Sequence, residues 1–384
     1  MRHQNTVFYD LLKRVPWDAF TKLAAAHGVD ARVRRLPTKT QFIALLFATL
    51  SGASSLRDLV NGLLSHGERL YHLGARRVRR STLADANAQR SPEVFAGILQ
   101  LLMQQADSKL RRAIADTTLL IDATSLPLNM RSARWARFSA KLCGAKLHII
   151  YDAAAERPIY AAISAARIND ITAAKEMPIV PGATYVFDLG YYDYAWWAEL
   201  DRLQCRIVTR IKSNTPLQII ERLPLPADSS IISDCIGFLP QRQAKNRRNP
   251  LDHAVREVRV RTESGKVLRI LCNDLDAAAQ EIADLYKQRW QIELFFRWVK
   301  QTLKITRFLG VSENAVRIQI AVALIAYLLL RITHAAHRLQ LTPTEFARLV
   351  RINLMHRRRI DQLLEPTIAP DQHPQQGQLQ WNLT

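Results

Sequence analysis

Apolar residues recur at helical spacing at both ends of the chain. Within residues 1–80, the stretch LLFATLSGASSLRDLVNGLL predicts a helix, a turn of small residues and a second helix, a pattern shared by DNA-binding domains and plain helical domains. Residues 277–307 and 314–338 predict two long helices. The most apolar run, Ile318–Ile332, is shorter than the ~20 residues of a membrane span, so we expect a buried helix there.

The middle of the chain carries short apolar runs typical of strands. These runs are TLLIDAT (118–124), KLHIIYD (146–152), PIYAAISAARI (158–168), ATYVFDLG (183–190) and CRIVTRI (205–211). The segment DYAWWAELDRLQ between the last two predicts a helix, and strands with interposed helices indicate a mixed α/β sheet. Residues 213–272 contain five prolines, a basic segment and the alternating stretch AVREVRVRT, which together predict a β-rich insertion with a hairpin.

Charge narrows the classes of partner. The 384 residues include 54 Lys and Arg against 34 Asp and Glu, giving a net charge of +20 and a pI of about 10.2. Such a chain is expected to meet a polyanion, with nucleic acid as the first candidate and an anionic membrane surface as the second. The N-terminus lacks the apolar core of a secretory signal, and four widely spaced cysteines predict neither a zinc knuckle nor a disulfide scaffold, which fits the cytosol.

A single glutamate, Glu293, lies within the strongly basic run YKQRWQIELFFRWVKQTLK (286–304). On one continuous helix, polar residues would form one stripe and apolar residues the opposite face. The stripe holds Tyr286, Arg289, Glu293, Arg297, Lys300 and Lys304, with Trp290 beside it. Taken alone, the pattern also fits ordinary ion pairs of Glu293 with Arg289 or Arg297 at i,i+4 spacing.

Two aspartates follow apolar strands and precede small residues. Asp122 stands in LLIDATS and Asp188 in YVFDLGY, where each side chain would be rigidly placed beside room for a substrate. Phosphodiester chemistry with two divalent metal ions needs about three converging carboxylates, which Asp122, Asp188 and Glu293 would supply. Both aspartates also fit loop or helix caps. The competing aspartates are Asp116, Asp152, Asp170 and Asp193, of which Asp170 (or Asn169) and Asp193 resemble helix caps.

These residues give the chain a resemblance to a known family. The spacing Tyr-x2-Arg-x3-Glu-x6-Lys is present as Tyr286, Arg289, Glu293 and Lys300, and together with LLIDATSL and DLGYYDY it resembles the DDE transposases of the insertion-sequence-four family over roughly residues 115–335. The resemblance implies an α/β fold with a ribonuclease H-like catalytic core, a β-rich insertion and a preceding all-helical domain. The expected parts are a DNA-binding helical domain (1–80), the first part of the core (81–212), the insertion (213–272), the C-terminal core helices (273–345) and a partly disordered tail (346–384).

The resemblance also implies the chemistry. Asp122, Asp188 and Glu293 are expected to bind two Mg²⁺ or Mn²⁺ ions, which drive cleavage at the ends of an insertion sequence, with hairpin ends, and strand transfer into target DNA. Tyr286, Arg289 and Lys300 are expected to grip phosphates near the element end, and Trp290 to stack on a displaced base or to pack against the insertion. Further expected DNA contacts are Arg297, Lys304, Arg247 and Arg248, and also Arg131, Arg134, Arg137 and Lys141 if their stretch is helical.

The expected partners are double-stranded DNA of the element ends and of the target, and a second copy of the chain in a synaptic homodimer. The expected location is the cytoplasm, on the nucleoid, with no membrane association. In one respect the sequence departs from the family: the residue after the second aspartate is usually Arg and here is Leu189, which makes the activity of this copy a question. The rival functions are a DNA-binding regulator that never cuts, and a nuclease on the same fold without strand transfer.

Overall fold

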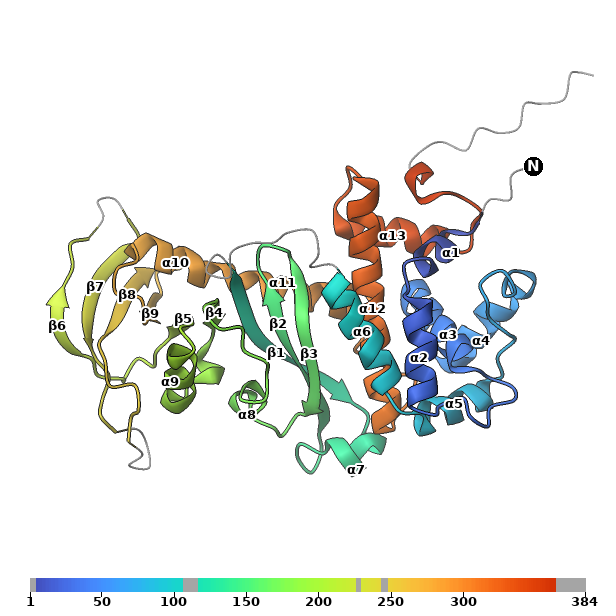
Figure 1. Cartoon of the computed structure of the whole chain (residues 1–384), viewed down its shortest axis with the longest axis horizontal. Coiled ribbons are helices and arrows are strands. Elements are labelled where there is room, and N and C mark those ends of the chain that lie inside the picture. Colours follow the sequence, from blue (N-terminus) through green and yellow to red (C-terminus); the bar gives the residue numbers. More distant parts are fainter. Residues whose placement is uncertain (1–4, 106–116, 226–228, 243–247, 364–384) are drawn as a thin grey trace, which may run out of the picture.

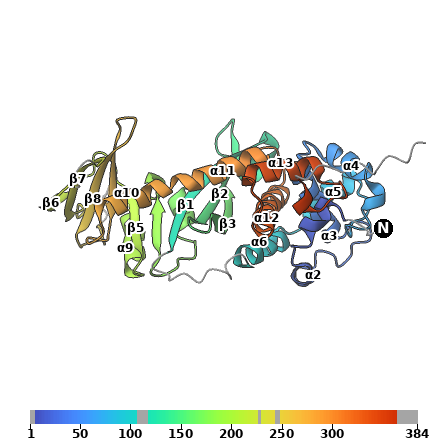
Figure 2. The same ribbon diagram turned by 90° about the horizontal axis from the view of Figure 1, so that it is seen from above.

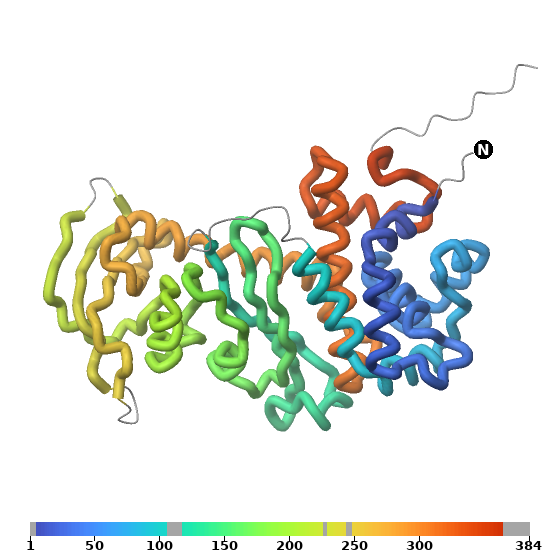
Figure 3. Tube along the Cα trace, in the orientation of Figure 1, coloured from blue at the N-terminus to red at the C-terminus, as the bar shows by residue number. Residues whose placement is uncertain are grey.

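The computed structural model describes residues 5–105, 117–225, 229–242 and 248–363. The molecule is elongated, with a helical unit at one end and a long sheet that runs to the other end (Figures 1 and 2). The chain trace shows that the N-terminal and C-terminal helices lie together in the helical unit (Figure 3). Hydrogen bonds from the amides of Val7 and Phe8 to the carbonyls of His356 and Leu354 join the two regions.

The helical unit surrounds one apolar helix, α12 (Glu313–His337). Its members are α1 (Val7–Leu12), α2 (Trp17–Ala26), α3 (Thr38–Ser51), α4 (Leu56–Leu64), the 3₁₀ turn η1 (Gly67–Arg69), α5 (Arg80–Gln89), α6 (Glu93–Gln105), α13 (Pro343–Asn353) and the 3₁₀ turn η6 (Ile360–Gln362). Helices therefore continue past residue 80, and the segment expected to be a tail includes most of α13. Residues 364–384 lie outside the described part.

Helix α12 is apolar on all sides because other helices cover it. Its most extensive contacts are with α3, α5, α6 and α13, and it is the only single helix in the described ranges that is long and apolar enough to cross a membrane. Since 78% of its apolar window is buried inside the protein, the expected buried helix is observed.

The predicted helix–turn–helix is present, and its role in DNA binding stays a prediction. Helices α3 and α4 meet at 100° across Gly52, whose φ of +78° is a left-handed value that favours glycine. Nearly every side chain of α3 is buried, so α3 serves as a core helix.

The sheet has the strand order β3-β2-β1-β4-β5-β9-β8-β7-β6. Its first half comprises β1 (Thr118–Leu128), β2 (Cys143–Asp152), β3 (Arg157–Ala165), β4 (Thr184–Phe187) and β5 (Arg206–Arg210). Strands β1, β2 and β3 are antiparallel, whereas β4 and β5 run parallel to β1, which is the ribonuclease H-like arrangement. The mixed α/β fold with a helical N-terminal region is therefore confirmed.

The two faces of this sheet are covered by different helices because side chains alternate along a strand. Leu120, Val186 and Val208 join the core that contains the buried face of α11 (Trp290–Thr302). The residues next to these along each strand point to the other face and belong to a second core, which contains Trp196 and Trp197 of α9 (Tyr194–Arg202). Asp193 caps α9 by accepting a hydrogen bond from the amide of Trp196, as the sequence predicts.

The β-rich insertion continues the same sheet. Strand β9 (Val267–Cys272) pairs antiparallel with β5, and β8 (Val255–Arg261), β7 (Ile231–Phe238) and β6 (Gln218–Arg222) follow outward. Several of its arginines are held in ion pairs: Arg256 pairs with buried Asp234, while Arg259 and Arg269 share Glu257. Part of the basic character of this segment therefore stabilises the fold.

Two helical expectations differ from the structure. The predicted helix at 277–307 is two helices, α10 (Ala279–Gln288) and α11, which meet at Arg289. In the stretch expected to carry an arginine face, the structure has a 3₁₀ turn, η3 (Met130–Ser132), and one four-residue helix, α7 (Ala133–Ala136). No continuous helical face therefore joins the four basic residues Arg131, Arg134, Arg137 and Lys141.

Candidate active site

Parallel pairing places the two aspartates at matching points of adjacent strands. Leu120 of β1 pairs with Val186 of β4, and Asp122 and Asp188 each follow two residues later. Asp188 lies just past the end of β4 and starts the 3₁₀ turn η4 (Leu189–Tyr191), where its carboxylate accepts a 2.8 Å hydrogen bond from the amide of Gly190. Asp122 accepts a 2.7 Å hydrogen bond from the amide of Ala123.

Helix α11 brings Glu293 to the same place. Its apolar residues Ile292, Phe295 and Val299 are buried, and this turns Glu293 in the first turn toward β1. A cavity of about 490 Å³ is lined by the three carboxylates Asp122, Asp188 and Glu293, together with Ala123, Thr124, Arg289, Phe296, Arg297, Lys300 and Gln301. The structure thus gathers all three predicted carboxylates around one space.

Arg289 lies between two of these carboxylates. Its guanidinium is 2.5 Å from Glu293 Oε1 and 3.6 Å from Asp122 Oδ2. The ion pair with Glu293 that the sequence pattern left open is therefore observed, and the expected contact of Arg289 with DNA stays a prediction. The ordinary i,i+4 ion pair with Glu293 is formed, and the same guanidinium also lies near Asp122.

The cavity shifts the pKa values of two of the groups that line it, Asp122 and Lys300. Burial, helped by the charges of Asp188 and Glu293 and opposed by the Ala123 amide and Arg289, raises the pKa of Asp122 from 3.8 to about 7. Burial lowers the pKa of the Lys300 ammonium, and the nearby Asp122 opposes that effect. An added cation in the cavity would relieve the repulsion among the carboxylates.

The donor set fits a hard divalent cation, because three carboxylates offer the oxygen ligands that Mg²⁺ and Mn²⁺ prefer. Within the described ranges, no three His, Cys, Asp or Glu side chains already stand as a metal-holding group. The guanidinium of Arg289 now compensates Asp122 and Glu293, so it has to yield for a cation to share these carboxylates.

The other residues predicted for DNA divide into two groups. Arg297 and Lys300 line the cavity, and Trp290 is 50% exposed with the Arg297 guanidinium 5.7 Å from its ring centre. Tyr286 instead is buried beneath Arg289, which lies 5.8 Å from the ring centre. Lys304 points away from the cavity: a Cβ on Gly52 at the end of α3 would lie 3.2 Å from its ammonium.

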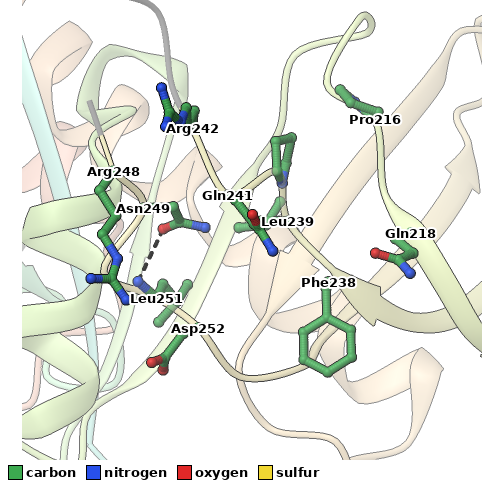
Figure 4. Close-up of a pocket in the computed structure, with 11 residues that line it drawn as sticks. Pro216, Gln218, Phe238, Leu239, Gln241, Arg242, Arg248, Asn249, Leu251 and Asp252 are labelled. Carbon is green, nitrogen blue, oxygen red and sulfur yellow. Dashed lines mark hydrogen bonds between the residues drawn. The ribbon is translucent and has the colours of Figure 1, made fainter. Parts of the chain in front are cut away.

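The insertion contains a larger cavity of about 890 Å³. Arg242 and Arg248 lie on one side of it, opposite Gln218 and Phe238 (Figure 4). Arg248 therefore belongs to this second cavity rather than to the carboxylate cavity. The neighbouring Arg247 lies outside the described residues.

The sequence interpretation missed a polar cluster behind Asp188. Asp170, expected to cap a helix, is the first residue of α8 (Asp170–Ala174), and Asn169 takes the cap position. The Asp170 carboxylate accepts a 2.9 Å hydrogen bond from Lys146 of β2. The alternation in KLHIIYD was the available signal, because it places Lys146 and His148 on one face of the strand.

Comparison with known proteins agrees with this geometry. Residues 114–329 match the family model of the transposase DDE domain, and residues 3–76 match a domain of unknown function, DUF4372. The chain is 38% identical over 291 residues to y4zB of Sinorhizobium fredii, whose name assigns it as a transposase, covering 76% of this chain and 82% of that protein.

A Geobacillus stearothermophilus protein, named as a transposase for insertion sequence element IS5377, is 28% identical over 263 residues, covering 67% of this chain and 68% of that protein. Among solved structures, the piggyBac transposase synaptic complex with hairpin DNA aligns with a TM-score of 0.48 at 12% identity, covering 94% of this chain and 81% of that one. The family-model match spans more than half of the sequence and includes all three carboxylates. The chain therefore belongs to the DDE transposases of insertion sequences.

Proposed function

We propose that this transposase binds the ends of its insertion sequence and cuts and joins DNA at the cavity formed by Asp122, Asp188 and Glu293. The observation that carries the proposal is the meeting of three carboxylates from β1, the end of β4 and α11 around one cavity that is also lined by Arg289, Arg297 and Lys300. A phosphodiester would find negative ligands for metal ions and positive groups for its own oxygens in the same place.

The three carboxylates would hold two Mg²⁺ or Mn²⁺ ions. When bound, such ions activate the attacking oxygen and stabilise the leaving oxygen of an in-line displacement. Asp122 and Asp188 stand on rigid strand ends, which favours a fixed geometry, and Glu293 joins them from α11. Arg289 would release Glu293 and Asp122 and turn its guanidinium to a phosphate, for which its planar donors are suited.

Three side chains on or beside α11 would hold the DNA end. Lys300 and Arg297 line the cavity and would contact phosphates on either side of the cut. Half-exposed Trp290 would stack on a base displaced at the end, which supports hairpin formation as the cleavage intermediate. Buried Tyr286 would support Arg289 from below rather than touch DNA.

Contacts away from the cavity would fix the DNA end in place. Arg248 in the insertion and the helical unit offer further basic surface, and a cavity in that unit of about 790 Å³ is lined by Arg32, Arg34 and Arg35. We propose that two copies pair on the two element ends, in the cytoplasm on the nucleoid. A net charge of +20 supports such binding.

The test uses Glu293→Gln and a duplex carrying the inverted repeat that flanks the gene. We expect Mg²⁺-dependent cleavage to be lost while binding of the duplex is kept. The matched control is Glu313→Gln, because Glu313 also forms an i,i+4 ion pair in the first turn of a helix but does not line the cavity. Undiminished cleavage by Glu293→Gln would refute the site.

The same assay separates the rival functions. A wild-type protein that binds the duplex and never cuts it would be a regulator, and this would also answer the question raised by Leu189. Cleavage without joining of the 3′ end to a target plasmid would identify a nuclease. Hairpin ends on a denaturing gel would support the proposed intermediate.

A further inference from the structure

Behind the carboxylate cavity, a polar cluster joins β2 to the turn that carries Asp188. It consists of Lys146 and His148 of β2, Asp170 of α8 and Tyr191 of η4. Lys146 donates hydrogen bonds to Asp170 Oδ1 at 2.9 Å and to the carbonyl of Ile168 at 3.0 Å. His148 is fully buried, with Nδ1 4.0 Å from Asp170 Oδ1 and Nε2 2.8 Å from Ser164 Oγ. One carboxylate oxygen of Asp170 is thus fixed from the sheet side.

The other oxygen of Asp170 lies against the catalytic turn. A Cβ added to Gly190 would lie 3.5 Å from Asp170 Oδ2 and only 3.0 Å from Asp188 Oδ1. A side chain at this position would crowd Asp188 and contact Asp170, and the amide of Gly190 is the group that holds Asp188 at 2.8 Å. Helix α8 packs on both β2 and η4, so Asp170 stands between the sheet and the Asp188 turn.

From this arrangement we propose, on the basis of the function proposed above, that Asp170 is a positioning residue for Asp188 and that Lys146 holds Asp170 in place. The ammonium of Lys146 neutralises Asp170, so a fourth carboxylate stands beside Asp188 as a support and not as a competing anion. Asp170 braces the turn at Gly190, and the braced amide fixes the Asp188 carboxylate before any cation arrives.

Tyr191, the last residue of the same turn, is also buried near these carboxylates. Its side chain is 1% exposed, and its hydroxyl has no hydrogen-bond partner among the described residues. Burial raises the pKa of Tyr191, and Asp122, Asp170 and Asp188 raise it further, so the hydroxyl stays a donor among these carboxylates. The turn thus carries two donors, the Gly190 amide and the Tyr191 hydroxyl, close to the catalytic aspartates.

The variants Asp170→Asn and Lys146→Met test the proposal, because each removes the charge of one partner in the ion pair. Residues that orient metal ligands typically change metal affinity by about 10- to 100-fold when removed. We therefore expect each variant to weaken Mn²⁺ binding, measured by calorimetry without DNA, by about tenfold. The double variant is expected to be no weaker than either single variant, since both act through one contact. End-duplex binding is expected to stay unchanged.

The matched control is Lys175→Met, which breaks another lysine–aspartate pair, 3.1 Å from Asp193, on the neighbouring helix cap. This control is expected to keep wild-type Mn²⁺ affinity. A variant with lower thermal stability but unchanged Mn²⁺ affinity would overturn the positioning role and leave a structural one.

Calorimetry measures the binding of Mn²⁺ itself, and this measurement does not depend on DNA cleavage. Failure of the wild-type protein to cut DNA would therefore count against the proposed function alone. Equal Mn²⁺ affinity in wild type, Asp170→Asn and Lys146→Met would count against this inference alone.

Discussion

At the scale of single residues, folding raises the pKa of the Asp122 carboxyl into the neutral range. Its pKa is about 7 in the folded chain and 3.8 in its ordinary state, so folding takes up a proton between these values. A folded form that binds more protons loses stability as pH rises, so the metal-free protein is expected to lose stability from about pH 4 to pH 7. A divalent cation binds the ionised form, and its affinity is expected to rise over the same range.

Replacing Asp122 by Asn removes this cost of ionising a buried carboxylate. In EDTA at pH 8, we expect Asp122→Asn to be more stable than wild type by roughly 1–4 kcal/mol, since each pKa unit corresponds to about 1.4 kcal/mol. Near pH 4 the difference is expected to vanish. Urea unfolding at both pH values measures it, with exposed Asp284→Asn as control. The same gain at both pH values would contradict the explanation.

Arg289 is expected to compete with cations for the carboxylates it now pairs with. Arg289→Gln removes the guanidinium from Glu293 and Asp122, so Mn²⁺ binding without DNA is expected to tighten by severalfold, in line with the ~1 kcal/mol of a partly exposed ion pair. Cleavage is expected to fall, because the same guanidinium is needed at the phosphate. Arg297→Gln, which lines the cavity on the same helix, is the control for calorimetry. Weaker Mn²⁺ binding by Arg289→Gln would exclude the competition.

At the scale of elements, the sequence predicted the strands and helix faces that follow from the local pattern of apolar residues. Short apolar runs located β1, β2 and β4, and the buried face of α11 falls on Ile292, Phe295 and Val299 as the 3.6-residue period requires. The nearness of Arg289 to Asp122 was not predictable from periodicity, because the two residues are distant in the sequence. Asp170 was missed for the same reason: its role comes from Lys146 and Gly190, which only the folded sheet brings near.

The insertion depends on a buried ion pair that also fixes the start of the catalytic helices. Arg256 of β8 forms two hydrogen bonds with Asp234 of β7, at 2.9 and 2.7 Å, and donates to the carbonyls of Leu275 and Ala277 just before α10. Breaking a buried pair leaves an unpaired charge and typically costs about 3–5 kcal/mol. We expect Arg256→Ala to lower unfolding stability by this order and to lower cleavage as well.

The control for that variant is Arg261→Ala, because Arg261 is an exposed residue at the end of the same strand. It is expected to change stability by less than about 0.5 kcal/mol. Equal losses in thermal melts of the two variants would show that the charge of the strand matters and the buried pair does not.

At the scale of the whole molecule, the helical unit and the catalytic sheet are joined directly. Arg351 of α13 donates to the carbonyl of Leu50 in α3 and to that of Thr302 in α11, and Lys304 lies against Gly52 nearby. These cations stand at the C-terminal end of α3, where the helix dipole favours positive charge. Helical periodicity in the sequence placed Lys304 on the stripe expected to contact DNA, whereas the structure places its ammonium at this junction.

The net charge of +20 leads to a last prediction about the whole molecule, because only cations that replace counterions on DNA contribute to salt dependence. Arg297 and Lys300 line the cavity without a carboxylate partner at ion-pair distance in the described structure, so both are expected to contact phosphates. Arg297→Gln and Lys300→Gln should each reduce the slope of log affinity against log salt by about one, measured on the end duplex. Arg359→Gln should leave it unchanged, because Arg359 is already 2.5 Å from Asp361. If the double variant Arg297→Gln, Lys300→Gln kept the wild-type slope, the DNA path would have to cross another face of the protein.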